Sequence, residues 1–199
     1  MKKICATILL SALISISAAA QFKVETGVNW GGYIPNTSYK GLTGTFARGL
    51  YDIRLGSDII NDHLYVETGA GYLLNRSRND VDGDVMNAHW LQVPLLFGTD
   101  RSVDGGGLFA DFGVYYGYCV RAEEAGYDIL NRNGKDDYDK YVRFYKPHDF
   151  GIMGHIGYRF EMGFGIGLTY QYGLLHLHVN SNMNTSVLAL SLSWRFQNL

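Results

Sequence analysis

Apolar and mixed side chains alternate along this chain, and the alternation recurs in eight segments of about ten residues each. A period of two places successive side chains on opposite faces of a strand. In the first segment, Phe22, Val24 and Trp30 alternate with Lys23 and Glu25. The expected strands cover residues 22–31, 48–55, 64–74, 89–98, 108–118, 149–160, 164–172 and 188–196. The chain has 15 Tyr, 10 Phe and 25 Gly but only 3 Pro, which also favours an all-β fold.

The mixed face decides between two barrel architectures. It is rich in glycine, and its few charges are balanced in sign, whereas a water-facing sheet would carry many lysines and threonines. A transmembrane barrel turns its apolar face to lipid and encloses the polar one. About ten residues tilted by about 45° span the hydrocarbon layer. We therefore expect an eight-stranded antiparallel up-and-down transmembrane β-barrel, with a soluble lipocalin-like or streptavidin-like barrel as the alternative.

The stretch "HWLQVPLLFG", residues 89–98, places a proline inside one of these strands. Leu91, Val93 and Phe97 share the apolar face, which puts Gln92 and Pro94 in the lumen. Proline cannot donate a ladder hydrogen bond, so we expect a bulge or a lumenal side chain to compensate for it.

The spacing of the strands predicts two unlike ends. Connections after the first, third, fifth and seventh strands are long, at roughly residues 33–44, 75–88, 121–147 and 174–185, and the others are short. This alternation is typical of long outer loops and short periplasmic turns.

The N-terminus predicts export. Lys2 and Lys3 precede an apolar run, and Ala18 and Ala20 form an A-x-A site, so residues 1–20 are expected to be a cleaved signal peptide and residues 21–199 the barrel domain. Without the two lysines, 15 basic and 19 acidic side chains remain, a formal net charge of −4, which argues against a nucleic-acid partner. Cys119 is then the single thiol, so no internal disulfide can form.

The lumenal face carries ten charged residues, five of each sign. Charges in a narrow barrel must pair, because an isolated buried charge is very unfavourable. We expect Glu25 beside Arg54 and Arg195, Arg54 beside Glu67, and Asp111 beside Arg159. A salt-bridged plug is the main interpretation and a gated conduit the alternative, since eight strands leave room only for side chains. The ten residues are Lys23, Glu25, Arg48, Asp52, Arg54, Glu67, Asp111, Asp149, Arg159 and Arg195.

Two further patterns contain residue types that can carry chemistry. His148, Asp149, His176, His178 and Ser181 gather at one predicted rim, where a hydrolase or acyltransferase would need a base beside a nucleophile, but no spacing enforces that contact. "DVDGD", residues 80–84, and "NRNGKDD", residues 131–137, have the acidic density of calcium loops without the full pattern, so they are interpreted as turns. We therefore assign no catalytic, cofactor-binding or metal residue and expect no cofactor.

Several motifs resemble those of the PorT-like outer-membrane β-barrel proteins of Gram-negative bacteria. "HWLQVPLLFG" resembles that family's "YLEIPLLLK"-type strand, with Gln92 in place of the usual Glu, and "LYVETGAGY" resembles its strand with an inward acidic residue. "HDFGIMGHIGYRF" is similar to its "DfGl..G.G" strand, and "YQYGLLHLHVN" with "SVLALSLSWRF" to its last hairpin. The resemblance implies an outer-membrane barrel, in a family whose members range from secretion-system components to barrels of unknown role.

We expect a non-enzymatic protein of the cell outer membrane that contacts outer-membrane lipid and anchors long extracellular loops for envelope structure or partner recognition. A component of a protein-secretion or envelope machine is the alternative, and a lipid-modifying enzyme the third hypothesis. The longest connection, residues 121–147, mixes acidic, basic and tyrosine side chains, a composition typical of recognition surfaces, and is the expected contact for an envelope or extracellular protein. Alternation in "DKYVRFYKP" also suggests that the fifth and sixth strands extend outward as a ribbon.

Overall fold

The structure is a computed structural model that describes residues 20–34, 38–55, 63–101, 105–130, 144–178 and 182–196. The predicted signal peptide lies outside these residues apart from Ala20, which begins the first strand. Within the described part of the chain, no helix has the length and hydropathy needed to cross a membrane.

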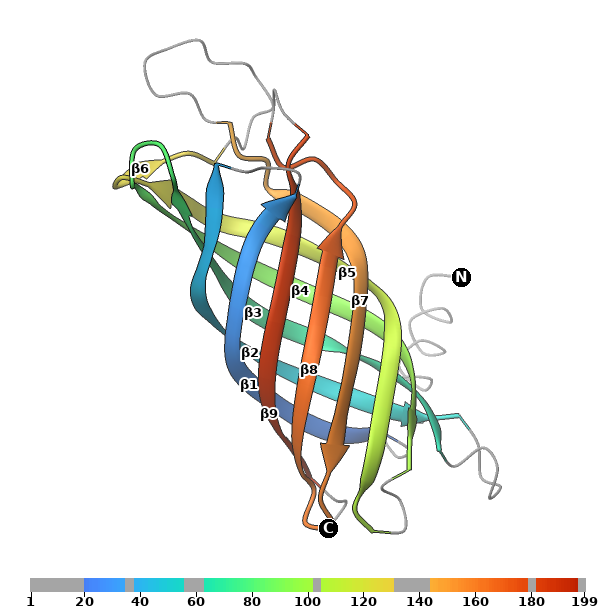
Figure 1. Ribbon diagram of the computed structural model, residues 1–199. Coiled ribbons are helices and arrows are strands. Elements are labelled where there is room, and N and C mark those ends of the chain that lie inside the picture. Colours follow the sequence, from blue (N-terminus) through green and yellow to red (C-terminus); the bar gives the residue numbers. More distant parts are fainter. Residues whose placement is uncertain are drawn as a thin grey trace, which may run out of the picture.

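Eight long antiparallel strands form one closed barrel (Figure 1). Neighbouring strands pair in chain order, and β4 with β5 and β9 with β1 complete the circle, while the two-residue β6 pairs only with β5. The predicted up-and-down barrel is confirmed. The strands are β1 (Ala20–Ile34), β2 (Tyr39–Arg54), β3 (Leu64–Asn79), β4 (Val85–Asp100), β5 (Gly107–Glu124), β6 (Tyr127–Asp128), β7 (His148–Arg159), β8 (Phe164–Gly173) and β9 (Asn184–Arg195).

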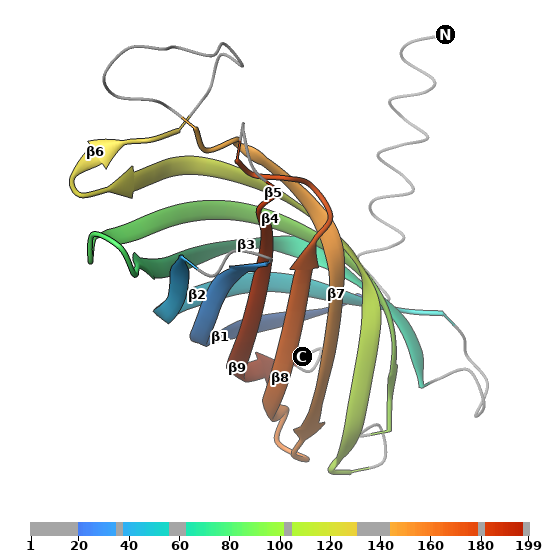
Figure 2. The same cartoon turned by 45° about the horizontal axis from the view of Figure 1, so that its top comes forward.

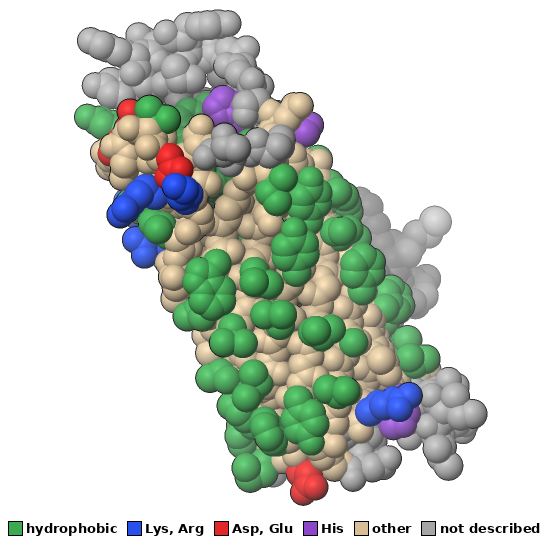
Figure 3. Space-filling view, in the orientation of Figure 1, with side chains coloured by type: hydrophobic (Ala, Val, Ile, Leu, Met, Phe, Trp, Pro, Cys, Tyr) green, Lys and Arg blue, Asp and Glu red, His purple; other side chains and the backbone are tan. Residues whose placement is uncertain are grey.

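The two faces of the strands follow the predicted alternation. Side chains such as Trp30, Phe97 and Phe112 lie on the outer wall, where apolar groups cover the surface visible in Figure 3. Nine of the ten predicted lumenal charges are buried, and the side chain of Arg54 is 17% exposed. An apolar wall around a charged interior is the arrangement of a membrane barrel, not of the soluble alternative.

Pro94 faces the lumen as expected, but neither predicted compensation occurs. The β3–β4 register is the same on both sides of the proline, so there is no bulge between these strands at this point. Instead, the Thr68 hydroxyl, on the lipid-facing parity of β3, donates to the Pro94 carbonyl oxygen at 2.9 Å. The prediction of a bulge or a lumenal partner was therefore wrong.

All four predicted long loops were drawn too long, because the strands continue past the expected boundaries. Only residues 35–38 separate β1 from β2, and residues 80–84 separate β3 from β4. Residues 33–34, 39–44, 75–79, 85–88, 121–124, 127–128 and 184–185, expected in loops, belong to strands. These connections, with residues 125–147 and 174–183, make the loop end of the barrel, and the opposite end holds both ends of the described chain, so we call it the terminal end (Figure 1).

The extra strand length forms a sheet that projects from one side of the loop end. We call it the sheet extension and define it as residues 39–42, 75–79, 85–89 and 121–128, from β2 to β6 (Figure 2). A bulge in β2 between Leu42 and Thr45 and another opposite His89 and Trp90 mark its base, and such irregularities bend a sheet. The ribbon expected around "DKYVRFYKP" falls mostly on residues 139–143, which lie outside the described residues, and in the described part the end of β5 pairs with β6.

Lumenal glycines make room for large side chains in the narrow interior. A Cβ on Gly98 would lie 2.4 Å from Cζ of Tyr65 and 2.7 Å from Cβ of Asp111. A Cβ on Gly167 would lie 2.3 Å from Nε2 of His155. Small residues thus alternate with large ones, as the interior of a small barrel requires.

Candidate functional site

The charged groups nearest the terminal end centre on Asp100, the last residue of β4. Its carboxylate accepts a hydrogen bond from Nη1 of Arg195 at 2.5 Å, contacts Arg159, and lies 3.5 Å from Nη2 of Arg54. Arg195 also pairs with Asp52. Three guanidinium groups and two carboxylates therefore fill the interior at this level.

A second group of charges lies further inside the barrel. The Lys23 ammonium pairs with Glu67 and lies 3.8 Å from Glu25, whose other oxygen accepts a hydrogen bond from Nη2 of Arg48 at 3.0 Å. The same nitrogen of Arg48 donates to the Thr169 hydroxyl at 3.3 Å. All these charged side chains are buried, so they are screened little by water.

Glu67, Asp111 and His155 form a cluster that the sequence did not predict. One potential ligand atom from each lies within 4.8 Å of the others, and all three residues are buried. Nδ1 of His155 is 3.4 Å from the Asp111 carboxylate, which also accepts a hydrogen bond from the Tyr65 hydroxyl at 2.8 Å. Two carboxylates and an imidazole are a donor set that transition metals accept. The Lys23 ammonium already supplies a positive charge to Glu67, so the cluster serves as part of the ionic network.

The ion pairs differ from the predicted ones. Glu25 pairs with Arg48 and Glu67 with Lys23, Asp111 contacts the His155 imidazole, and Arg54 and Arg159 turn to Asp100. Asp100 was missed, although it shares the parity of Gln92 and Pro94 and could have been found by continuing the alternation. Asp111 on β5 and His155 on β7 are direct cross-strand partners, whereas Glu67 reaches them from β3, which pairs with neither strand.

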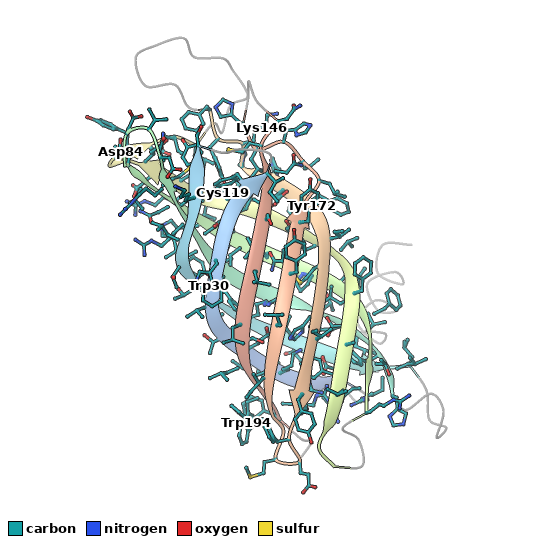
Figure 4. The ribbon with its side chains drawn as sticks, viewed as in Figure 1. Trp30, Asp84, Cys119, Lys146, Tyr172 and Trp194 are labelled. Atoms are coloured by element: carbon teal, nitrogen blue, oxygen red, sulfur yellow. The ribbon has the colours of Figure 1, made fainter. Side chains whose placement is uncertain are left out.

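Apolar residues from the loop end close the barrel above the charges. Tyr145 is fully buried, its ring centroid lies 5.9 Å from that of Trp90, and its hydroxyl is 2.9 Å from that of Tyr33. Burial raises the pKa of Tyr145 well above its usual value, so it remains a neutral phenol. Leu130, Leu177 and Met183 belong to the same cluster, as does the buried Cys119 (Figure 4).

Between this apolar cluster and the charges lies a small polar layer. The Asp149 carboxylate accepts hydrogen bonds from the Tyr115 hydroxyl at 2.8 Å and from the Thr185 hydroxyl at 2.6 Å. The neighbouring gap, lined by residues that include Trp90 and Gln92, has no space for a water molecule. The described residues therefore fill the interior as a plug would, and do not leave the open path of a conduit.

The predicted rim histidines are not brought together. His148 lies on the outer wall, 2.6 Å from the Tyr116 hydroxyl, whereas its neighbour Asp149 points inward. Nδ1 of His176 is 3.1 Å from the Asn184 amide oxygen, and His178 stacks on Phe144 with 4.8 Å between ring centroids. Ser181 lies outside the described residues. The part of the chain that the structure describes thus gives these histidines separate surroundings.

The sheet extension encloses a concave surface with four carboxylates. The pocket has a volume of about 540 Å³ and lies between the sheet extension and residues 129, 144 and 178. We call it the acidic concavity. In this concavity the Tyr39 hydroxyl donates a hydrogen bond to the Glu124 carboxylate and lies 2.9 Å and 3.1 Å from its two oxygens. It is lined by Tyr39, Asn79, Asp82, Asp84, Glu124, Ala125, Tyr127, Asp128, Ile129, Phe144 and His178.

The residues "DVDGD" form the turn that was predicted for them. Gly83 has φ of +77°, and the backbone N–H of Val81 donates to the Asn79 side chain at 2.9 Å. The second acidic stretch, residues 131–137, lies outside the described residues. Asp82 and Asp84 of the turn line the acidic concavity, a role that local pattern did not predict (Figure 4).

Comparison with known proteins identifies the family. Residues 15–179 match the family described as the outer membrane protein beta-barrel domain. The chain belongs to this family. It is accordingly a protein of the outer membrane, as its apolar outer wall indicates. No curated protein matches the sequence.

Solved outer-membrane barrels have a similar architecture at low identity. OprG of Pseudomonas aeruginosa is 12% identical, with 90% of this chain and 97% of that one covered and a TM-score of 0.48. Ail of Yersinia pestis is 12% identical, with 89% and 97% covered and a TM-score of 0.42. The outer membrane enzyme PagL is 12% identical, with 86% and 98% covered and a TM-score of 0.49. Similarities this distant say nothing about the role of this chain.

Proposed function

We propose that this protein is a non-enzymatic outer-membrane scaffold whose barrel holds the acidic concavity outside the membrane to bind a protein partner. The observation that carries the proposal is the combination of aromatic rings and carboxylates in one pocket of the sheet extension at the loop end. We assign this end to the cell exterior, because outer-membrane barrels carry their longer connections there.

The chemistry of the acidic concavity favours a basic partner segment. Asp82, Asp84, Glu124 and Asp128 give it four negative charges, and Tyr127 is 56% exposed at its edge. Tyrosine beside charged groups is frequent in recognition surfaces, and aromatic faces also attract arginine. A lysine- or arginine-containing segment of an envelope or extracellular protein fits this surface.

The PorT-like resemblance gives a narrower version of the proposal. In it the partner is another component of a secretion or envelope machine. Both versions place binding at the loop end and differ in the identity of the protein bound, so partner identification separates them.

Site-directed crosslinking in native outer membranes tests the proposal. A photoreactive residue in place of Tyr127 should give a specific crosslinked product, whereas one in place of Met162, exposed in the turn at the terminal end, should not give that product. Asp82→Asn with Asp84→Asn should reduce the product at least tenfold, whereas Asp80→Asn with Glu161→Gln, which removes the same charge elsewhere, should leave it. If the product is absent, or insensitive to Asp82 and Asp84, the proposal fails.

A further inference from the structure

The outer wall of the sheet extension carries a group of basic side chains that the proposed partner site does not use. Lys40 on β2 is opposite Arg78 on β3, and one row lower Arg76 is opposite Asn87 on β4. The next row places His89 opposite Arg121 on β5. We call Lys40, Arg76, Arg78 and Arg121 the basic wall. Figure 3 shows basic side chains gathered at this upper corner of the molecule, above the apolar surface.

Part of the positive charge of the basic wall is left without a carboxylate. Lys40 pairs with Asp80 at 2.9 Å, and Arg121 with Glu123 at 2.5 Å. Arg76 donates to the Asn87 side chain at 3.1 Å and to the Thr43 carbonyl at 3.3 Å, which are both neutral. Arg78 is exposed and makes no ion pair with any described residue. Two of these four cations thus make no ion pair with any described residue.

The basic wall lies directly beyond the apolar part of the barrel. Below it on β3 are Leu74 and Tyr72, and the Tyr72 hydroxyl is 2.6 Å from Nδ1 of His89. Arg76 and Arg78 lie two and four residues beyond Leu74, or about 7 and 13 Å along a strand. Tyrosines mark the membrane–water boundary, and the headgroup layer above it is about 5–8 Å deep on each side. Because the strands are tilted, both guanidinium groups are within reach of this layer.

We infer that the basic wall binds the phosphate group of an outer-leaflet lipid. Guanidinium groups form paired, charge-assisted hydrogen bonds with phosphate oxygens, and Arg76 and Arg78 offer two of them on one strand face. The neighbouring Tyr72 and Leu91 present apolar surface where the acyl chains of such a lipid begin. The opposite, concave side of the same sheet is acidic, so the two faces bind ligands of opposite charge independently.

Lipid binding by the folded protein in mixed micelles tests the inference. The probe is fluorescent lipid A that carries both phosphates, compared with the same lipid without phosphates. Arg76→Gln with Arg78→Gln should weaken binding of the phosphorylated lipid at least tenfold. Arg101→Gln with Lys146→Gln removes the same charge from exposed positions outside the basic wall and should leave the affinity unchanged. Heat-modifiable gel migration verifies that each variant is folded.

Two further arms identify the source of the phosphate. The lipid without phosphates should bind the parent no better than phosphorylated lipid binds the Arg76 and Arg78 variant. Inorganic phosphate should fail to displace the lipid at the concentration at which unlabelled phosphorylated lipid displaces it. Displacement at equal concentration would show a free-phosphate site, and equal binding by parent and variant would show that the basic wall holds no lipid. Either result overturns the inference.

Discussion

The Lys23 ammonium pairs with the Glu67 carboxylate inside the barrel, where both side chains are at most 1% exposed. The two residues lie on β1 and β3, so the contact reaches past β2, which lies between these strands. It joins the group around Glu25 and Arg48 to the cluster of Asp111 and His155.

Glu67→Ala should destabilise the barrel by about 3–5 kcal/mol, because it leaves the Lys23 charge buried without its closest partner. Glu67→Gln should cost less, since the amide oxygen still accepts a hydrogen bond from Lys23. The free energy of unfolding in denaturant, measured in lipid vesicles, gives both values, with Glu161→Ala in an exposed turn as the control. Equal losses for Ala and Gln would mean that water reaches Glu67.

Gly98→Ala should cost about 1–3 kcal/mol, the range for overpacking a filled interior. The new methyl group would displace Tyr65 from its hydrogen bond to Asp111. Gly154→Ala is a matched control, because a Cβ there meets only Phe112 at 3.6 Å on the outer wall. The same denaturant titrations compare the two variants, and similar stabilities would show that the lumen near Tyr65 has spare volume.

The pKa of His178 should lie below the usual histidine value of 6.5. Burial is the larger cause, and the nearby Lys146 charge is the smaller one. NMR of the imidazole protons measures the midpoint. Lys146→Gln should move it upward without restoring the usual value, since burial remains. The folded state then binds fewer protons than the unfolded state. The contribution of His178 to the stability of the fold is therefore present above about pH 6.5 and is lost as pH falls toward the folded-state pKa. A midpoint at or above 6.5 would mean that His178 is solvated or paired with an anion.

The sequence predicted the two faces of the strands well, because period-two alternation assigns each side chain to a face. Lys23, Glu67 and Pro94 face the lumen, and Phe97 faces outward, as expected. The ends of the strands were not predictable in the same way. The residues of the sheet extension are expected in loops, because a barrel strand that continues beyond the membrane has no apolar face to mark where it stops.

The partners inside the barrel depend on the register of the strands, which strand order does not give: Glu25 lies opposite Arg48, and Asp111 opposite His155. Tilt displaces neighbouring strands along the axis, so residues on adjacent segments need not lie at one level. Long side chains then reach across the lumen, as Arg48 does to Met153 on β7 at 3.3 Å. Likewise, no local pattern shows that Tyr145, in the longest connection, folds back to cover Trp90.

The central claim is that the barrel is a sealed scaffold that acts through its loop end and conducts no ions. Planar-bilayer conductance tests this claim most directly. The two charge groups, the Asp149 layer and the apolar cluster of Tyr145 fill successive levels of the interior. Purified, folded protein should therefore give no steady ion current, or only rare small openings. Large, stable and reproducible channels would contradict the account and identify the charged interior as a conduit.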